Sequence, residues 1–410
     1  MQTLLHRRWL DAFRSLRHRE FRILWSGLIV SAVGTWMQII AQSLLVLQLT
    51  RGSAFALGLV SLAQALAFFV FALIGGGFAD RLDRKRLLLV TQSTLMCLAL
   101  MLGILTSTGT IRVWMIVVIA FVSGAVLSFD QPTRAALVAS LVPKEDLLNA
   151  VSLQSAVFNG ASTLGPALAG ITVDVIGLSA NFFLNAASFL AVLIGLLFVS
   201  TAGLPRVNGR PKLLVQVSEA LNTVKRDKVL PQLLLSYGTL LFFGPSLQLL
   251  LPVLAIRVLH IDAATLGILF SAAGIGAVSG ALFLASFSST IRAGAILPMA
   301  FAVWTASLIV AGLSKTVAIT AAALICLGMS QSVIGAMTST LLQTRVPHEQ
   351  RGRVMSLNTL LIMGIRPLGD FPAGAFISLW GAPLTAAASA TVVAMAALLV
   401  FVRRSVFRAV

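Results

Sequence analysis

Residues 56–85 read ALGLVSLAQALAFFVFALIGGGFADRLDRK, an apolar run that ends in a cluster of Arg and Lys. A helix needs about 20 apolar residues to cross the hydrocarbon core of a bilayer, and residues 56–78 supply them. The same pattern recurs along the chain and predicts an all-α polytopic membrane protein with twelve transmembrane helices. The twelve expected spans are residues 23–47, 56–78, 87–106, 113–133, 150–176, 182–200, 231–256, 265–287, 294–313, 317–341, 354–380 and 383–402.

The composition supports a lipid environment. Of the 410 residues, 58% are hydrophobic and only 10% are charged, whereas a soluble domain carries about 25% charged residues. The net charge of +17 resides in short basic clusters between apolar runs, which does not fit a nucleic-acid-binding face. Cys97 and Cys326 lie far apart in apolar runs, so we expect no disulfide, no metal site and no cofactor.

The distribution of Lys and Arg predicts the orientation of the chain. If both ends lie inside the cell, the cytoplasmic segments contain 25 of the 30 basic residues and the outer segments only 4. Basic loops are retained on the cytoplasmic side of the membrane. We therefore expect a multi-pass protein of the bacterial inner membrane with its N- and C-termini in the cytoplasm.

An internal repeat relates the two halves of the chain. Residues 142–177 match residues 346–381 at a constant offset of 204, so spans 5 and 11 are equivalent. An offset of six spans predicts two parallel six-helix repeats, an arrangement seen in secondary transporters. The central loop is expected to be partly a surface-lying amphipathic helix or, alternatively, an unstructured tether. The expected parts are a tail (1–22), a six-helix bundle (23–200), the central loop (201–230), a second six-helix bundle (231–402) and a tail (403–410).

The loop after the second span carries a family resemblance. Its sequence around Gly76, Asp80, Arg81, Arg84 and Lys85 resembles the signature loop of the major facilitator superfamily, with Asp83 where glycine is usual. The stretches 21–22, 34–38, 49–54 and 57–58 resemble the branch of that superfamily that contains the enterobactin exporter and other siderophore exporters. The resemblance implies a fold of two six-helix halves that move relative to each other.

The same loop is expected to take part in a cytoplasmic gate. Asp130 and Arg134 are spaced i,i+4 late in span 4, on the same surface as the signature loop. The resemblance implies a charge network between spans 2 and 4 that stabilises the outward-open state. The residues of this expected gate are Gly76, Asp80, Arg81, Arg84, Lys85, Asp130 and Arg134. Two alternatives remain open: direct proton coupling by Asp130, and a merely solvated ion pair.

Span 11 contains the charges expected at the greatest depth. Arg366 and Asp370 are spaced i,i+4, and Pro367 and Pro372 interrupt the surrounding backbone hydrogen bonds. Ionisable groups inside a bilayer are functional candidates by default. We expect an ion pair in which Asp370 exchanges a proton while Arg366 modulates it or binds an anionic substrate. The alternative is a permanent structural pair that locks span 11 to its neighbours.

Span 5 contains a motif of small residues around Gly165, Pro166 and Gly170, where the chain can pack tightly and bend. The stretch resembles the exporter motif of the superfamily, with Ala161 and Ala169 where glycine is usual. That resemblance favours export over uptake. The alternative is a glycine-rich packing helix of the kind found in any transporter.

The expected substrate cavity lies between spans 1, 4, 7 and 10, as the superfamily resemblance implies. Polar residues of span 1 recur at helical spacing and form one stripe. The candidate cavity residues are Ser31, Thr35, Trp36, Gln38, Gln42, Tyr237, Gln248 and Gln331. A lipid-facing position and core packing are the alternatives for the tryptophan.

The residues taken together predict a transporter rather than an enzyme, since no phosphate-binding loop or complete zinc-protease motif is present. The leading hypothesis is proton-driven export of a small siderophore-like molecule by antiport and alternating access. The alternatives are a multidrug/proton antiporter of the same fold and a non-transporting membrane scaffold or sensor. The expected partners are the small-molecule substrate, protons, the lipid bilayer and an outer-membrane efflux protein, with the chain itself a monomer.

Overall fold

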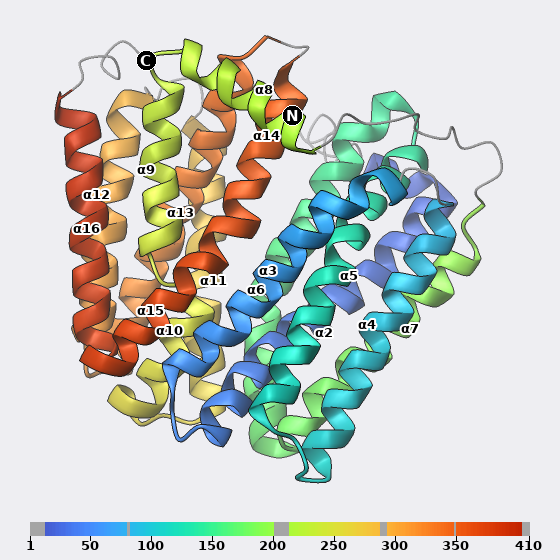
Figure 1. Ribbon diagram of the computed structural model, residues 1–410, viewed down its shortest axis with the longest axis horizontal. Helices are drawn as coiled ribbons and strands as arrows, with labels where there is room; N and C mark the ends of the chain where they lie inside the picture. Colours follow the sequence, from blue (N-terminus) through green and yellow to red (C-terminus); the bar gives the residue numbers. More distant parts are fainter. Residues whose placement is uncertain (1–12, 80–82, 201–212, 288–292, 348–349, 404–410) are drawn as a thin grey trace, which may run out of the picture.

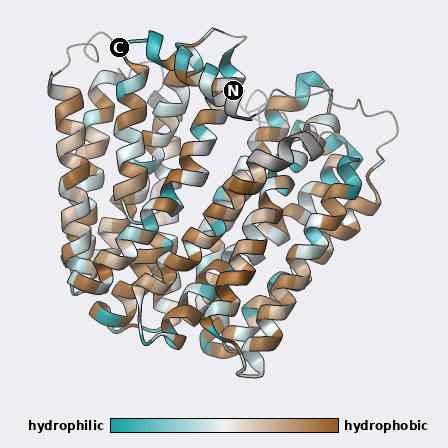
Figure 2. Ribbon diagram, viewed as in Figure 1, coloured by the Kyte–Doolittle hydropathy of each residue, from teal (hydrophilic) through white to brown (hydrophobic). Residues whose placement is uncertain are grey.

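The computed structural model describes residues 13–79, 83–200, 213–287, 293–347 and 350–403. Every regular element in these residues is a helix, which confirms the all-α prediction. Apolar residues dominate the lengths of the helices, and hydrophilic residues gather toward their two ends (Figure 2). A hydrocarbon layer imposes this distribution, because only helices or closed barrels satisfy their own backbone hydrogen bonds in lipid.

The helices form two groups that stand side by side (Figure 1). The first group comprises η1 (Arg14–Arg17), α2 (Arg19–Leu49), α3 (Ala54–Ala79), α4 (Arg84–Ser107), α5 (Val113–Ser140), η2 (Lys144–Asp146), α6 (Leu147–Val175) and α7 (Leu178–Leu197). After α8 (Leu213–Arg226), the second group comprises α9 (Leu230–Phe243), α10 (Leu247–Leu254), η3 (Ala255–Leu259), α11 (Ala263–Phe287), α12 (Ala293–Leu313), α13 (Val317–Thr344), α14 (Arg351–Leu360), η5 (Leu361–Ile365), α15 (Arg366–Trp380) and α16 (Ala382–Arg403).

Eleven helical segments of the described chain are long and apolar enough to cross a membrane. They correspond to eleven of the twelve expected spans. The remaining span, residues 354–380, lies on α14, η5 and α15, which follow one another without a gap. The π-helical segment η5 divides this span into two shorter α-helices.

The seventh span is broken, so the prediction of one continuous helix over residues 231–256 is wrong. α9 ends at Phe243, and Gly244, Pro245 and Ser246 separate it from α10. Pro245 has no backbone N–H to continue the helix. Ser246 starts the next helix as its N-cap, where its Oγ accepts a hydrogen bond from the Leu249 backbone N–H at 3.2 Å.

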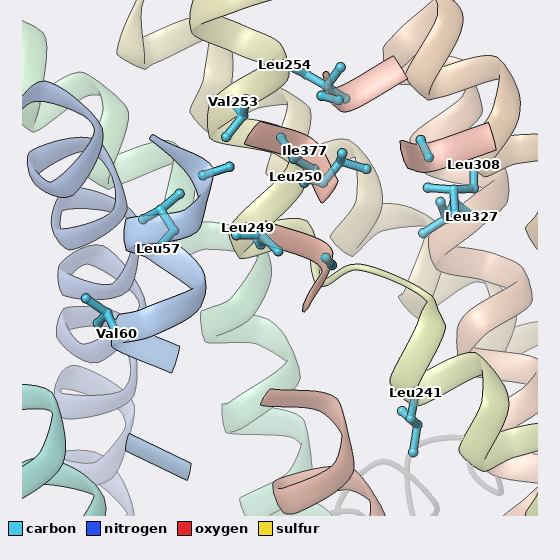
Figure 3. Packing of buried hydrophobic residues seen from close by; sticks show 14 of the residues in the cluster. Leu57, Val60, Leu241, Leu249, Leu250, Val253, Leu254, Leu308, Leu327 and Ile377 are labelled. Carbon is cyan, nitrogen blue, oxygen red and sulfur yellow. The ribbon is translucent and has the colours of Figure 1, made fainter. Parts of the chain in front are cut away.

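Among the described residues, two buried hydrophobic clusters contain members of both groups. We call the end where α2 begins and α16 ends the terminal end, and the opposite end the distal end. Near the distal end, Leu57 and Val60 of α3 lie in one buried cluster with Leu250 and Val253 of α10 and Ile377 of α15 (Figure 3). The packing of the two groups against each other therefore depends on the distal half of the molecule.

At the terminal end each group has a separate core. Phe21 and Leu137 belong to a buried cluster of the first group, whereas Leu342 and Leu357 belong to a cluster of the second. Among the described residues, neither of these two clusters contains a member of the other group. In the described part of the chain, the buried clusters shared by the two groups therefore lie toward the distal end, while α3 also contacts α8 of the central loop.

Small residues bring α6 and α11 into close contact across the two groups. A Cβ atom added to Gly267 of α11 would lie 2.5 Å from the Pro166 carbonyl oxygen, and one on Gly170 would overlap the carbonyl of Ala263. The Ser271 hydroxyl also donates to the Thr163 carbonyl oxygen at 2.7 Å. The small-residue motif of span 5 therefore forms a packing face between the halves, while Pro166 lies within one continuous helix.

The helix α8 in the central loop packs against protein. Its buried residues Ala220 and Val224 share a core with Val354 and Leu357 of α14. The Thr223 hydroxyl, on the same helix, donates to the side-chain oxygen of Gln350 at 2.8 Å. These contacts attach the described part of the central loop to the second group.

We predict that Gly170→Ala lowers the thermal stability of the protein, because the new methyl group would force α6 and α11 apart. Overpacking of this kind costs about 1–3 kcal/mol. The melting temperature in detergent, followed by size-exclusion chromatography after heating, measures the effect. Gly160→Ala is the matched control in the same helix, since no atom lies within 4 Å of its added Cβ. Equal melting temperatures for the two variants would contradict the assignment.

Candidate functional site

Asp130 is fully buried in the half of α5 that lies toward the terminal end of the molecule. One of its carboxylate oxygens accepts hydrogen bonds from Thr91 Oγ1 at 2.9 Å and from Gln92 Nε2 at 2.7 Å, both on α4. The other oxygen forms an ion pair with Arg134 one turn later, which confirms the expected pair. Charge-assisted hydrogen bonds of this kind compensate for the removal of a carboxylate from water.

The basic residues at the start of α4 contact other helix ends rather than Asp130. Arg84 Nη1 donates to the Ala136 carbonyl oxygen at 3.4 Å. Lys85 Nζ donates to the carbonyl oxygens of Leu197 at 3.1 Å and Val199 at 2.6 Å, at the end of α7. A cation at a helix C-terminus is stabilised by the unpaired carbonyls there.

The predicted network between spans 2 and 4 is therefore only partly visible. Asp80 and Arg81 lie outside the described residues, and Gly76 lies in the last part of α3. The described contacts of Asp130 lead to α4, the third span, because Thr91 and Gln92 supply its other hydrogen bonds. The expectation that Asp130 contacts the signature loop stays a prediction for the two residues that are not described.

Asp370 binds the break in the seventh span. Its side chain is buried, and its Oδ1 accepts a hydrogen bond from the Ser246 backbone N–H at 2.9 Å. The break leaves the first N–H groups of α10 without partners inside that helix, and a carboxylate is a favourable acceptor at a helix N-terminus. The neighbouring Gly369 allows the close approach, because an added Cβ would overlap the Phe242 carbonyl.

The expected ion pair between Arg366 and Asp370 is wrong: among the described residues these two side chains do not form a salt bridge. The carboxylate turns toward Ser246. The guanidinium turns toward α13, where the side-chain oxygen of Gln331 accepts hydrogen bonds from Nη1 at 3.0 Å and Nη2 at 3.2 Å. The amide of Gln331 is oriented here by these donors. Arg366 Nε is buried and has no hydrogen-bond partner in the described chain.

Tyr237 completes a polar cluster in the second group. It is buried in α9, its hydroxyl lies 3.6 Å from the position of a Cβ on Gly335 of α13, and it interacts electrostatically with Arg366. Arg366, Gln331 and Tyr237 thus come together from α15, α13 and α9. We call these three residues the arginine cluster.

The π-helical segment η5 brings the first group to the edge of the arginine cluster. The ring of Phe69, on α3, packs so closely on Gly364 that any Cβ at that position would overlap the ring. Gly364 precedes Arg366 by two residues. Short π-helical segments often occur at functional sites, and here one places a contact between the two groups beside the half-buried Arg366.

The polar stripe of span 1 divides between two environments. Gln38 accepts a hydrogen bond from Asn185 Nδ2 of α7 at 2.7 Å, so its side chain belongs to the contact between α2 and α7. Ser31 is buried as well. Thr35 and Gln42 are half-buried, and their side chains make no hydrogen bonds within the described chain. Of the four residues in this stripe, Thr35 and Gln42 keep the properties expected of a cavity wall.

The remaining cavity candidates lie in different places. Trp36 faces α6, where it makes an edge-to-face contact with Phe158 at 5.8 Å between ring centroids and packs on Gly165. Its position in a helix contact favours the packing alternative. Gln248 is half-buried in the first turn of α10, close in sequence to Ser246.

Sequence reasoning missed three residues that the structure makes important. Ser246 supplies the amide that binds Asp370, and the preceding Gly244-Pro245 pair was a signal for a break in the span. Asn185 supplies the partner of Gln38, and its polar character within an apolar span was visible in the sequence. Phe69 carried no comparable signal, because one aromatic ring in an apolar helix has no distinctive pattern.

The described helices have the fold of solved membrane transporters, and the sequence match reported below assigns the chain to the major facilitator superfamily. A bacterial homologue of the iron transporter ferroportin, solved in an inward-facing state, superimposes with a TM-score of 0.75 at 16% identity, covering 94% of this chain and 98% of the other. A bacterial homologue of the human lysosomal transporter Spinster, inward-facing and unoccupied, gives a TM-score of 0.72 at 15% identity over 95% of both chains. These likenesses concern the fold alone.

The family follows from the sequence. Residues 10–408 match the model of the transmembrane secretion effector family, and the chain belongs to this family of transporters. It is 26% identical to the enterobactin exporter of Citrobacter koseri over 94% of this chain and 91% of the relative. It is 23% identical to macrolide efflux protein A of Streptococcus pyogenes over 85% of this chain and 87% of the relative.

We predict that Asp370→Ala destabilises the protein more than Asp370→Asn. Alanine leaves the buried N–H of Ser246 without an acceptor, which costs about 1–3 kcal/mol, whereas the amide oxygen of asparagine can still accept. Melting temperatures in detergent measure the difference. Asp174→Ala is the control, because that exposed carboxylate also accepts a backbone N–H, from Ala264, where water can replace it. The assignment is wrong if both substitutions at 370 melt alike.

Proposed function

We propose that the chain exports a small molecule from the cytoplasm by alternating access of its two helix groups. The observation that carries this proposal is the distribution of buried apolar surface. The groups share a core at the distal end but have separate cores at the terminal end. Two bodies joined at one end can rock about a central site and open the other end, which is how parallel-repeat transporters work.

The charge distribution supports a cytoplasmic position for the terminal end. Most Lys and Arg residues lie in segments that this orientation puts inside the cell. Loops rich in Lys and Arg are retained on the cytoplasmic side of a membrane. The structure then corresponds to a form that is closed toward the outside. We place the chain in the bacterial inner membrane with both termini in the cytoplasm, acting as a monomer, with an outer-membrane efflux protein as a further partner.

The substrate is proposed to be siderophore-like. The similarity to an enterobactin exporter over most of the chain supports this choice. The similarity to a macrolide efflux protein supports an alternative, a multidrug/proton antiporter of the same fold. A non-transporting scaffold or sensor is a further alternative, and it predicts that Asp370→Asn leaves every phenotype intact.

Proton antiport is the proposed source of energy. Asp370 and Asp130 are buried carboxylates in membrane-spanning helices, and groups of this kind form proton relays in transporters. Asp130 has an arginine partner, whereas Asp370 accepts a backbone N–H and has Arg366 nearby without an ion pair. Asp370 is therefore the preferred proton-binding residue, with Arg366 as its modulator.

A first prediction concerns the opening of the distal end. The Phe55 backbone N–H donates to Ser378 Oγ at 3.0 Å, so cysteines at these two positions should be close enough for a disulfide. In a Cys97→Ala, Cys326→Ala background, we expect oxidation of Phe55→Cys, Ser378→Cys to stop pH-gradient-driven uptake of enterobactin or a macrolide into inverted membrane vesicles. Reductant should restore the uptake. Each single-cysteine variant is the control, and uptake that continues after complete cross-linking would rule out rocking.

A second prediction concerns proton coupling. We expect Asp370→Asn to reduce uptake driven by a pH gradient at least tenfold, while the melting temperature stays close to that of the unmodified protein. The asparagine keeps the acceptor for Ser246 but cannot carry a proton. Asp174→Asn, at an exposed position, is the control. Unchanged uptake by Asp370→Asn would remove this residue from the coupling step, and no uptake of either compound by the unmodified protein would refute export.

A further inference from the structure

Arg366 is a cation that the described chain leaves without a carboxylate partner. The carboxylates of the described spanning helices have other contacts: Asp130 pairs with Arg134, Asp370 accepts the Ser246 N–H, and Asp174 accepts the Ala264 N–H. Glu20 lies in the first turn of α2, at the terminal end. The guanidinium instead binds the neutral oxygen of Gln331 and keeps a buried Nε–H without an acceptor.

This arrangement leaves unused capacity for an anion. A guanidinium presents five N–H donors in a fixed plane and matches a carboxylate through two parallel hydrogen bonds. Gln331 occupies the two Nη groups with a single oxygen, which a charged acceptor can displace. The hydroxyl of Tyr237, which can donate a hydrogen bond, lies beside Gly335 on the same helix as Gln331. Asp370 acts on Arg366 through its charge alone, because it forms no ion pair with it.

The position of the arginine cluster suits a transported ligand. It lies where α9, α13 and α15 meet, and Phe69 of the other helix group packs on Gly364 at its edge. A ligand bound to Arg366 would therefore contact the second helix group. It would also lie next to the ring of Phe69 from the first helix group. Trp304 is buried nearby against Gly244, so the surroundings also include flat apolar surface.

We propose that the arginine cluster binds the acidic group of an aromatic organic anion, and that the transported substrate belongs to this class. The inference rests on the proposed export function and names its substrate class. The carboxylate of the anion takes the Nε and Nη donors of Arg366, Tyr237 donates to the same group, and the ring lies against the neighbouring aromatic side chains. A neutral or cationic molecule of the same shape leaves the half-buried charge of Arg366 uncompensated, which disfavours its binding.

Direct binding to the purified full-length chain tests the proposal. Salicylate serves as the anionic probe, salicylamide as its neutral counterpart of nearly equal shape, and tetraphenylphosphonium as an aromatic cation. Calorimetric titration in lipid nanodiscs is expected to give a Kd for salicylate at least tenfold lower than for salicylamide. Tighter binding of the amide or of the cation would overturn the proposal.

Two variants locate the binding by opposite routes. Arg366→Gln removes the cation, and Gln331→Glu neutralises it by placing a carboxylate at a position already within 3.0 Å of Nη1. Each is expected to weaken salicylate binding at least tenfold and to abolish the preference over salicylamide. Gln331→Glu keeps the size of the side chain and all charges of α15, so a loss there cannot come from a misfolded arginine variant. Arg112→Gln, which removes the same charge from an exposed position, should leave both affinities unchanged.

Vesicle transport separates this proposal from the proposed function. If a macrolide or tetraphenylphosphonium is exported and salicylate neither binds nor competes, the anion site is wrong and export stands. If salicylate binds in an Arg366-dependent way but no compound is transported, the site stands and export is wrong. Salicylate binding that persists in both Arg366→Gln and Gln331→Glu would also overturn the site.

Discussion

A helix break inside a membrane must find its hydrogen-bond partners within the protein, because lipid offers none. In this chain the break after α9 exposes the backbone N–H of Ser246, and the carboxylate of Asp370 on α15 accepts it. The bond joins the seventh and eleventh spans and turns the carboxylate away from Arg366. Both the break in the second helix group and the lack of an ion pair between Asp370 and Arg366 in the described chain are consistent with this contact.

The second determinant is how closely the two groups approach each other. Glycines on α6, α11 and α15 leave no room for a Cβ against the facing backbone, and buried apolar residues extend this contact through the distal half. At the terminal end the cores are separate. Since dispersion contacts between packed helices hold membrane bundles together, this asymmetry identifies the end at which separation costs less.

The charged sites around Asp130 and Arg366 differ in a way that suggests different tasks. Asp130 has its arginine and two further donors, so its charge is compensated inside the first group. Within the described residues, Arg366 donates its hydrogen bonds to the neutral amide of Gln331, and Phe69 of the other group packs close by on Gly364. The first arrangement resembles a permanent structural contact, and the second leaves a charge that a ligand can compensate.

The sequence by itself determined the helical class, the membrane environment, the family and the Asp130–Arg134 pair, because each depends on hydropathy, local spacing or a motif. It also singled out Arg366, Asp370, Tyr237 and Gln331 as deep polar residues. The tertiary structure alone decided their partners. The i,i+4 spacing of Arg366 and Asp370 allowed an ion pair in α15. The carboxylate of Asp370 instead accepts a hydrogen bond from the backbone N–H of Ser246, which is 124 residues away in the sequence. The side chain of Gln38 likewise accepts a hydrogen bond from Asn185 of another helix. Local periodicity shows which residues share a face, whereas the choice of partner depends on contacts between helices that are distant in sequence.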